Sequence, residues 1–466
     1  MFSFSRFWYR SDSEVCFLFH YITNNHSCNH VIYQSINQSI NQSKYLQIII
    51  IWITVTKVTY LVIFQVILID AVYESHGYGH VEHFIQYNFI ENEIKDDERH
   101  ATNIIQLLGK RVDEIDGCFT FEEYRIHLTA ILCQKLGLCG IIPTSALVVM
   151  SKQKTYKLIK ENCETALHSP LSYLIQKEDD IPNAEGITFP AILKPENGAT
   201  STAITDVFSV EDCITKYRKL INNPKCGDWG CSGFKNTMVL MEFLPGINYT
   251  VDVVIFNGKL LKALLTDMGP KLPPVFADTT TCFPSCLPKH LQMQLITASF
   301  QCCKAVGLQN GVFNVEMNLT SSGFKLVEIN GRAGSYRRCL VFRTTDSVDV
   351  LLVQALICCG IKPVFPDFQH SYAVGCYLYP PIHGKTLSDP KFLSKIKSLC
   401  EANEILYIKR TPEMGKDTSK LKLFSHLVAL DKTSILSAKQ KLIGIFQEFE
   451  MSTKDYDIDQ LTKHFF

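Results

Sequence analysis

The sequence lacks an excess of charge of either sign, because 46 lysine and arginine residues are balanced by 46 aspartate and glutamate residues in 466 positions. A chain without a global electrostatic field has no general attraction for nucleic acid or anionic lipid, so we expect neither as a partner. The apolar fraction of 46% and the charged fraction of 20% are typical of a globular protein and not of a disordered one. The length predicts about two to four domains.

The sequence also lacks the repeated Cys-x-x-Cys spacing of structural zinc sites, although it contains 18 cysteines. The cysteines are scattered, and only Cys302-Cys303 and Cys358-Cys359 form adjacent pairs. We therefore predict mostly reduced thiols in a cytoplasmic protein.

An apolar run from Leu46 to Ile69 follows a polar, low-complexity repeat. The run is long enough to span a bilayer, so a membrane anchor is one interpretation. Lys57 stands near its centre, where a lysine costs about 3 kcal/mol on insertion, and we therefore favour dividing the run at this residue. Val58 to Asp70 is then predicted as a buried parallel strand of a doubly wound sheet. Residues 1–57 are left as an N-terminal tail without an assigned role.

Helical and strand patterns alternate along the rest of the chain, which predicts an α/β (α+β) protein. Residues 58–150 form a small Rossmann-like unit in this interpretation, residues 151–362 form a larger domain, and residues 363–466 form a mixed α/β segment. The larger domain should begin with a basic helix, Ser151 to Asn162, and should contain strands within residues 189–204, 237–256 and 258–267.

A predicted hairpin, residues 312–330, carries two carboxylates on one face. A three-residue loop ending at Gly323 would place Glu316 opposite Glu328 and Asn314 opposite Asn330. Like charges that face each other across a sheet are destabilising, so something must neutralise them. A shared proton, a divalent cation and a fully solvated polar face are the three alternatives. Since oxygen ligands favour Mg²⁺ or Mn²⁺ over zinc, and Arg332 follows, we favour a metal ion.

Two lysines and one strand end are candidates for binding a nucleotide. Lys194 ends a strand before a loop of small and hydroxylated residues, whose backbone N–H groups can approach phosphate oxygens. Lys152 begins the upstream basic helix and can contribute a second charge. Glu242 precedes the break Phe243-Leu244-Pro245-Gly246, where exposed backbone groups beside apolar side chains suit an adenine ring.

In this order, the segments resemble the ATP-grasp superfamily of carboxylate–amine ligases. The family's two lysines match Lys152 and Lys194, and its glycine-rich loop matches Gly198 to Ala203, with Ala203 in place of the final glycine. The resemblance implies an ATP-grasp fold that uses ATP and Mg²⁺ (or Mn²⁺). It assigns ATP binding to Lys152, Lys194, Ser201, Glu242, Phe243, Leu244 and Asn248, metal binding to Glu316, Glu328 and Asn330, and a catalytic phosphate-binding role to Arg332. Asn248 is an amide where the family has a ribose-binding acid.

A closer resemblance covers about residues 60 to 455. The segments Asp116–Phe121, Leu132–Leu138, Thr266–Pro270 and Gly311–Glu316 are similar to those of ligases that join β-alanine to histidine. This resemblance implies small-molecule substrates: a β-alanine-like or γ-aminobutyrate donor and an L-histidine acceptor. Such a chain would correspond to the C-terminal half of the longer family members.

Several alternatives stay open at this stage. Arg337, Arg338 and Arg343 either bind a substrate carboxylate or are surface arginines. Glu122 and Glu123 either meet a substrate ammonium group or form an acidic helix start, and we favour the helix start. The chain could join another pair of amino acids, or bind a nucleotide without catalysis, which Ala203 and Asn248 suggest. The oligomeric state, including a homo-oligomer, also stays open.

Overall fold

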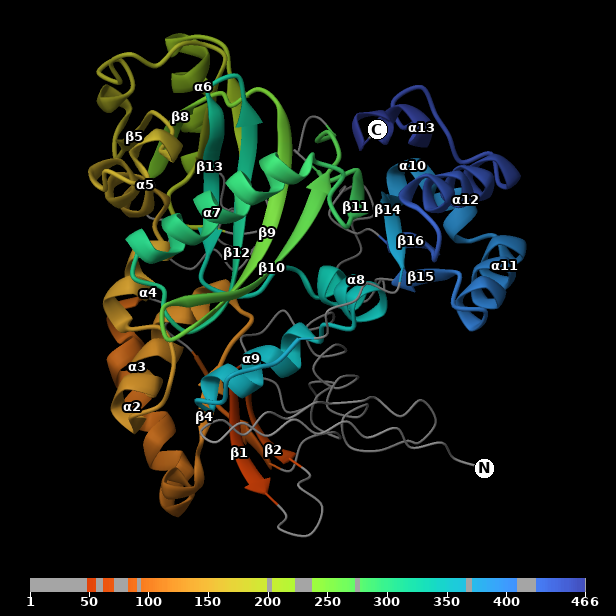
Figure 1. Cartoon of the computed structure of the whole chain (residues 1–466). Coiled ribbons are helices and arrows are strands. Elements are labelled where there is room, and N and C mark those ends of the chain that lie inside the picture. Colours follow the sequence, from red (N-terminus) through yellow and green to blue (C-terminus); the bar gives the residue numbers. More distant parts are fainter. Residues whose placement is uncertain are drawn as a thin grey trace, which may run out of the picture.

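The computed structural model describes residues 48–55, 62–70, 83–89, 94–198, 203–222, 237–272, 277–365, 371–408 and 425–465. These residues form three β-sheets with helices packed against them, as Figure 1 shows. No helix within these ranges is both long enough and apolar enough to cross a membrane.

The first sheet has four strands in the order β3-β2-β1-β4. They are β1 (Ile48–Val55), β2 (Val62–Asp70), β3 (His83–Gln86) and β4 (Gly117–Phe119). The predicted strand ending at Asp70 is present as β2, but the assignment of everything before Lys57 to a tail is wrong, because β1 is an inner strand of this sheet. The sheet is also mixed and not fully parallel: β2 is parallel to β3, whereas β1 is antiparallel to both β2 and β4.

Both faces of the first sheet are covered. Helices α2 (Asp97–Leu108) and α3 (Ile126–Leu136) pack on the face that carries Ile67 and Ile69. Val66 and Leu68 alternate to the other face and pack against α9 (Val350–Cys358). The N-terminal unit therefore depends on a helix from a distant part of the chain for one of its two cores.

The second sheet is antiparallel, in the order β5-β8-β6-β7. Its strands are β5 (Ser172–Ile175), β8 (Met238–Glu242), β6 (Ala191–Pro195) and β7 (Thr205–Val207). Helix α6 (Val210–Ile221) buries Cys213 and Tyr217 against one face. The opposite face carries Val239, which pairs with Lys194 in the register, and packs toward α5 (Lys152–Glu161) and the third sheet.

The third sheet has eight strands in the order β13-β12-β9-β10-β11-β14-β16-β15. The strands are β9 (Ile247–Phe256), β10 (Lys259–Met268), β11 (Thr280–Phe283), β12 (Gly311–Thr320), β13 (Gly323–Asn330), β14 (Tyr372–Leu378), β15 (Ile405–Ile408) and β16 (Ser425–Asp431). Helix α7 (Lys289–Ala305) lies across one face, as Figure 1 shows. Helices α8 (Tyr336–Asp346) and α9 pack on the other face.

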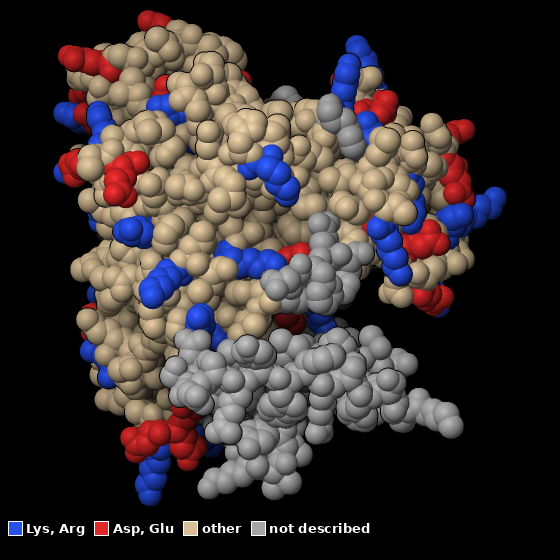
Figure 2. Space-filling view, viewed as in Figure 1, with Lys and Arg blue, Asp and Glu red and all other residues tan. Residues whose placement is uncertain are grey.

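The C-terminal segment continues this third sheet through β14, β16 and β15, and it does not form a separate layer. Its helices are α10 (Pro380–Leu387), α11 (Pro390–Glu401), α12 (Ile435–Glu448) and α13 (Ile458–Leu461). Figure 2 shows acidic and basic side chains interspersed over the visible face, in keeping with the balanced composition.

Candidate nucleotide and metal site

The hairpin of β12 and β13 places Glu316 opposite Glu328 and Asn314 opposite Asn330, as predicted. The predicted turn is wrong. Thr320 pairs with Gly323, so the loop has two residues, and the register shifts at a bulge beside Glu316, where Val327 is the extra residue. The shorter turn and the bulge displace the register in opposite directions, so the two carboxylates still face each other.

The two facing carboxylates differ in their electrostatic surroundings. Burial, and next the negative charge of Glu328, raise the pKa of Glu316 above its ordinary value. Burial also opposes ionisation of Glu328, but the positive charges of Lys152, Lys194 and Arg332 together hold its pKa below the ordinary value. Lys152 Nζ lies 3.4 Å from a carboxylate oxygen of Glu328. Glu328 therefore ionises more readily than Glu316.

Lys152 stands at the first position of α5, where the Ser151 hydroxyl caps the helix by accepting from the Lys154 N–H. Its ammonium group also donates to the carbonyl of Gly198, at 3.1 Å. Lys152 thus contacts both the start of the predicted phosphate loop and the hairpin of β12 and β13. Ser201, further along this loop, lies outside the described residues.

Lys194 enters the site from the end of β6 and is 2% exposed. Its ammonium group donates to the Tyr156 hydroxyl at 2.8 Å and to the Val327 carbonyl at 3.3 Å. Burial, and next the charge of Lys152, lower the pKa of Lys194 to about 7. In the absence of a nucleotide, the charge on this lysine is therefore divided between two states near neutral pH.

Tyr156 is a site residue that the sequence did not single out. Its hydroxyl accepts from Lys194 and donates to the Val327 carbonyl, and burial raises its pKa well above the ordinary value. Its only signal in the sequence is its position, four residues after Lys152, which places both side chains on one face of α5.

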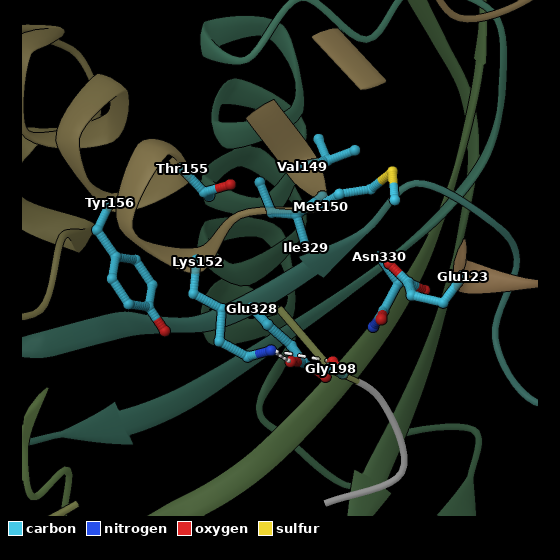
Figure 3. Close-up of a pocket in the computed structure, with 10 residues that line it drawn as sticks. All are labelled: Glu123, Val149, Met150, Lys152, Thr155, Tyr156, Gly198, Glu328, Ile329 and Asn330. Atoms are coloured by element: carbon cyan, nitrogen blue, oxygen red, sulfur yellow. Dashed lines mark hydrogen bonds and ion pairs between the residues drawn. The ribbon is translucent and has the colours of Figure 1, made fainter. Parts of the chain in front are cut away.

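Figure 3 shows the pocket that Lys152, Tyr156 and Glu328 line. Its polar wall combines a lysine, two acids and an amide from three different segments, and its apolar wall comes from α4 (Pro143–Val149), the residues after it and β13. The lining residues are Glu123, Val149, Met150, Lys152, Thr155, Tyr156, Gly198, Glu328, Ile329 and Asn330.

Arg332, predicted to bind phosphate, lies beside the pocket and pairs with Glu123, since its Nε is 2.9 Å from a Glu123 oxygen. It also donates to the side-chain oxygen of Asn330 at 3.4 Å. Glu123 opens the 3-10 helix Glu123–Arg125, which confirms the predicted acidic helix start, and it also lines the pocket. Burial raises its pKa above the ordinary value, although Arg332 opposes this effect.

The predicted adenine hinge joins β8 to β9. The backbone N–H of Leu171 donates to the Glu242 carboxylate at 2.8 Å, which anchors the hinge to the segment before β5. Phe243 is 45% exposed, so the hinge presents an apolar surface. Asn318, which the sequence did not single out, donates to the Leu244 carbonyl at 2.8 Å and accepts from the Asn248 amide at 2.9 Å. Because Asn318 is two residues from Glu316 in β12, it connects the hinge to the metal-ligand strand.

The three arginines that follow the hairpin have different surroundings. Arg338 is buried, and its Nε lies 3.6 Å from the buried carboxylate of Asp252. Arg343 lies 3.8 Å from Asp349, the residue that caps α9. The guanidinium of Arg337 lies 6.0 Å from the ring of its neighbour Tyr336. Arg338 and Arg343 therefore have structural ion pairs.

The ligand set of the hairpin fits a hard divalent cation. Two carboxylates face each other, and an amide oxygen stands beside them at Asn330. Oxygen ligands of this kind are those that Mg²⁺ and Mn²⁺ prefer. Glu316, Glu328 and Asn330 are thus able to hold such an ion.

Comparison with known proteins identifies the domain. A family model described as an ATP-grasp domain matches residues 187–339. Carnosine synthase 1 of Mus musculus is 29% identical over 402 residues, which are 83% of this chain and 47% of the mouse protein. Carnosine synthase 1 of Gallus gallus is 34% identical over 64% of this chain and 33% of the chicken protein. The chain thus spans about half the length of the mouse relative and about a third of the chicken one.

The fold also resembles solved structures. The crystal structure of an L-amino acid ligase from Bacillus licheniformis superposes with a TM-score of 0.59 and 14% sequence identity, covering 80% of this chain and 86% of that one. At this identity the likeness concerns the fold alone. The family match and the sequence relatives agree: the chain contains an ATP-grasp domain and is similar to the carnosine synthases.

Proposed function

We propose that this chain is an ATP-dependent ligase that joins the carboxyl group of a small amino acid to the amino group of L-histidine. β-Alanine or γ-aminobutyrate is the proposed donor, and the product would be carnosine or homocarnosine. The observation that carries the proposal is the pair Glu316 and Glu328, with Lys152 beside Glu328 and Lys194 bonded to the neighbouring Val327 carbonyl. The similarity to carnosine synthase supports the choice of substrates.

The chemistry requires activation of a carboxylate, whose own leaving group would be oxide. Transfer of the γ-phosphoryl group of ATP to a carboxylate oxygen gives an acyl phosphate and ADP. The amine nitrogen then attacks the acyl carbon, the C–O bond to phosphate breaks, and the amine proton is lost to solvent. The products are a dipeptide, ADP and inorganic phosphate.

The side chains of this site contribute mainly electrostatic stabilisation. Lys152, Lys194 and Arg332 would neutralise phosphate oxygens in the ground state and in the transition state. Mg²⁺ or Mn²⁺ held by Glu316, Glu328 and Asn330 would supply further positive charge at the β- and γ-phosphates. The pocket wall formed by Val149, Met150 and Ile329 would limit access of water to the acyl phosphate.

The adenosine part of ATP is assigned to the hinge. Backbone groups of Phe243 and Leu244 would bind the adenine edge next to Glu242, and Ser201 would contact the phosphates. The side-chain oxygen of Asn248 is buried and has no hydrogen-bond partner among the described residues, so it is available to accept from a ribose hydroxyl. This acceptor supports the proposal that the Asn248 amide contacts the ribose in the place of the family's acid.

The test is an ADP-release assay of the full chain with Mg²⁺, ATP, a panel of amino-acid donors and L-histidine. Turnover should need the ion, a donor and histidine together, and mass spectrometry should detect the dipeptide. ATP hydrolysis that is independent of the donor, or no turnover with any pair, would contradict the ligase assignment.

A second candidate function is ligation of a different amino-acid pair, which the fold likeness to the L-amino acid ligase of Bacillus licheniformis favours. This alternative keeps every residue of the ATP and metal site and changes only the amino-acid pockets. The same assay separates the two candidates, because only the preferred donor and acceptor would differ.

A further inference from the structure

A second group of potential metal ligands lies outside the nucleotide site. Asp267 stands near the end of β10, Cys282 is in β11, and Cys286 is in the segment between β11 and α7. Asp267 and Cys282 are direct partners in the β10–β11 register. The group therefore combines two neighbouring strands with the chain that leads into the next helix.

This group lies on the face of the third sheet opposite to Glu316. The register across β12, β9 and β10 aligns Met317 with Tyr249 and Tyr249 with Asp267, so these side chains share a face. Glu316 is the neighbour of Met317 and points the other way. The two groups of ligands are consequently separated by the sheet, and neither depends on the other.

The distances within the group are those of a tetrahedral site. The carboxylate oxygen and the two sulfur atoms all lie within 4.8 Å of one another, and the two sulfurs are 3.6 Å apart. Two thiolates bound to zinc, each at about 2.3 Å with tetrahedral geometry, lie about 3.8 Å from each other. The thiols thus need little movement to bind a common ion.

The carboxylate of Asp267 points independently to a missing cation. Asp267 is 3% exposed, and its Oδ1 has no hydrogen-bond partner among the described residues. Its Oδ2 accepts from the backbone N–H of Cys286 at 2.7 Å, which holds the side chain in place. Burial raises the pKa of Asp267 to about 6, although the side chain of Ser285 and the backbone of Cys286 oppose this effect. A buried acceptor without a partner is destabilising unless another group binds it.

We propose that Asp267, Cys282 and Cys286 bind one Zn²⁺ ion, with a water molecule as the fourth ligand. Two thiolates and a carboxylate suit zinc, which accepts sulfur and oxygen donors in tetrahedral geometry, whereas Mg²⁺ requires oxygen ligands. On binding, each thiol gives its proton to solvent and forms a bond to the ion. Cys286 is only partly buried, which provides a path of entry.

The ion would link β10, β11 and the residues between β11 and α7. One of them leads directly into α7, which packs against β9, β10 and β12 on the face behind the metal-ligand hairpin. The proposed zinc is therefore structural: it would stabilise the fold, and it would not take part in the ligase reaction.

The test measures zinc in the full chain, purified under reducing conditions, incubated with ZnCl₂ and dialysed without chelator. Plasma mass spectrometry should find one zinc ion per chain, and Co²⁺ in its place should give the strong near-ultraviolet absorption of thiolate-to-cobalt charge transfer. Cys282→Ser, Cys286→Ser and Asp267→Asn should each lose most of the zinc. Cys213→Ser, which removes a buried thiol elsewhere, should keep it.

Three results would overturn the proposal: no zinc in the dialysed protein, equal zinc in Cys286→Ser, or a Cys282–Cys286 disulfide in the protein as isolated without reductant. If the variants do not fold, thermal unfolding of the unchanged chain decides, because ZnCl₂ should raise its melting temperature and a chelator should lower it. An absence of both shifts would also overturn the proposal. Glu328→Gln should bind zinc normally, so the outcome is independent of the ligase assignment.

Discussion

At the scale of single residues, the proposed role of Lys194 requires a positive charge, but its buried surroundings oppose that charge. It is 2% exposed, its hydrogen-bond acceptors are the neutral Tyr156 hydroxyl and a carbonyl, and its pKa is lowered to about 7. A bound triphosphate would bring several negative oxygens close to the ammonium group. The pKa of Lys194 should then rise, which couples binding of the nucleotide to binding of a proton.

We therefore predict that ATP binding at about pH 8.5 is accompanied by uptake of nearly one proton, because free Lys194 is mostly neutral and bound Lys194 is charged. Well below pH 7 the lysine is charged in both states and uptake should disappear. Calorimetry in buffers of different ionisation enthalpy measures this number. Lys194→Met should abolish the pH 8.5 uptake, and an unchanged value in that variant would contradict the role of Lys194.

Glu328→Gln should reduce turnover about 100-fold or more, because it removes a charged metal ligand and the partner of Lys152 while it preserves shape. Steady-state assays give the rate, and thermal unfolding checks that the variant is folded. The matched control is Glu161→Gln, at an exposed ion pair of α5, which should be neutral. Equal rates for the two variants would be incompatible with a metal at the hairpin.

Ala203 occupies the left-handed region, with φ of +58°, at the position where the family loop has glycine. An alanine is strained in this conformation, so Ala203→Gly should raise the free energy of unfolding by about 1 kcal/mol. The same change at Ala298, in the interior of α7, should lower it by at least about 1 kcal/mol. Urea unfolding compares the two, and a loss of stability in Ala203→Gly would show that strain is not the dominant effect.

At the scale of elements, the hinge between β8 and β9 depends on close backbone contact. Gly246 has φ of +115°, and a Cβ atom at this position would lie 2.0 Å from the carbonyl oxygen of Leu319 in β12. The clash involves backbone on both sides, so it cannot be relieved by a side-chain rotation. The predicted adenine hinge and β12 therefore pack with their backbones in direct contact at Gly246.

Gly246→Ala should consequently lower the free energy of unfolding by about 2–4 kcal/mol. Gly258→Ala is the matched control, since its φ of +70° is also positive but no atom lies within 4 Å of the added Cβ. Its cost should be only about 1–2 kcal/mol. Chemical denaturation of both variants tests the contact, which would be refuted by equal losses.

The sequence predicts elements better than it predicts contacts between them. The hairpin of Glu316 and Glu328 follows from local alternation, and the facing carboxylates are confirmed even though the turn is wrong. Tyr156, Asn318 and Asp252 were not identified, because their partners lie in other strands or helices. A polar residue in a predicted strand gives no indication of which neighbour it meets until the strand order is known.

At the scale of the whole molecule, the sequence likewise does not predict which distant segments share a sheet or a core. Nothing local indicates that α9 covers the first sheet, or that β14, β15 and β16 extend the sheet of the metal site. The apolar run at residues 46–69 was divided correctly near Lys57, but its first half was not recognised as a strand. This first half is β1, which pairs with β2 as a long antiparallel hairpin. A continuous run of apolar residues does not distinguish such a hairpin from other folds.

A chain that begins at residue 58 should therefore be strongly destabilised, since removal of β1 separates β2 from β4 in the first sheet. A chain that begins at residue 48 retains β1 and is the control. Soluble yield and thermal unfolding compare the two proteins. If the shorter chain melts at the same temperature as the longer one, β1 does not contribute to the sheet.

The contact between Lys152 and Glu328 has a consequence for the order in which ligands arrive. Without ligands, Lys152 Nζ lies 3.4 Å from a carboxylate oxygen of Glu328 that a divalent ion would need. A free ion must compete with an ammonium group already in place, whereas triphosphate oxygens can draw the lysine away and leave the carboxylate exposed. Occupancy by the ion and by the nucleotide should then be mutually reinforcing, so that each lowers the dissociation constant of the other by one common factor.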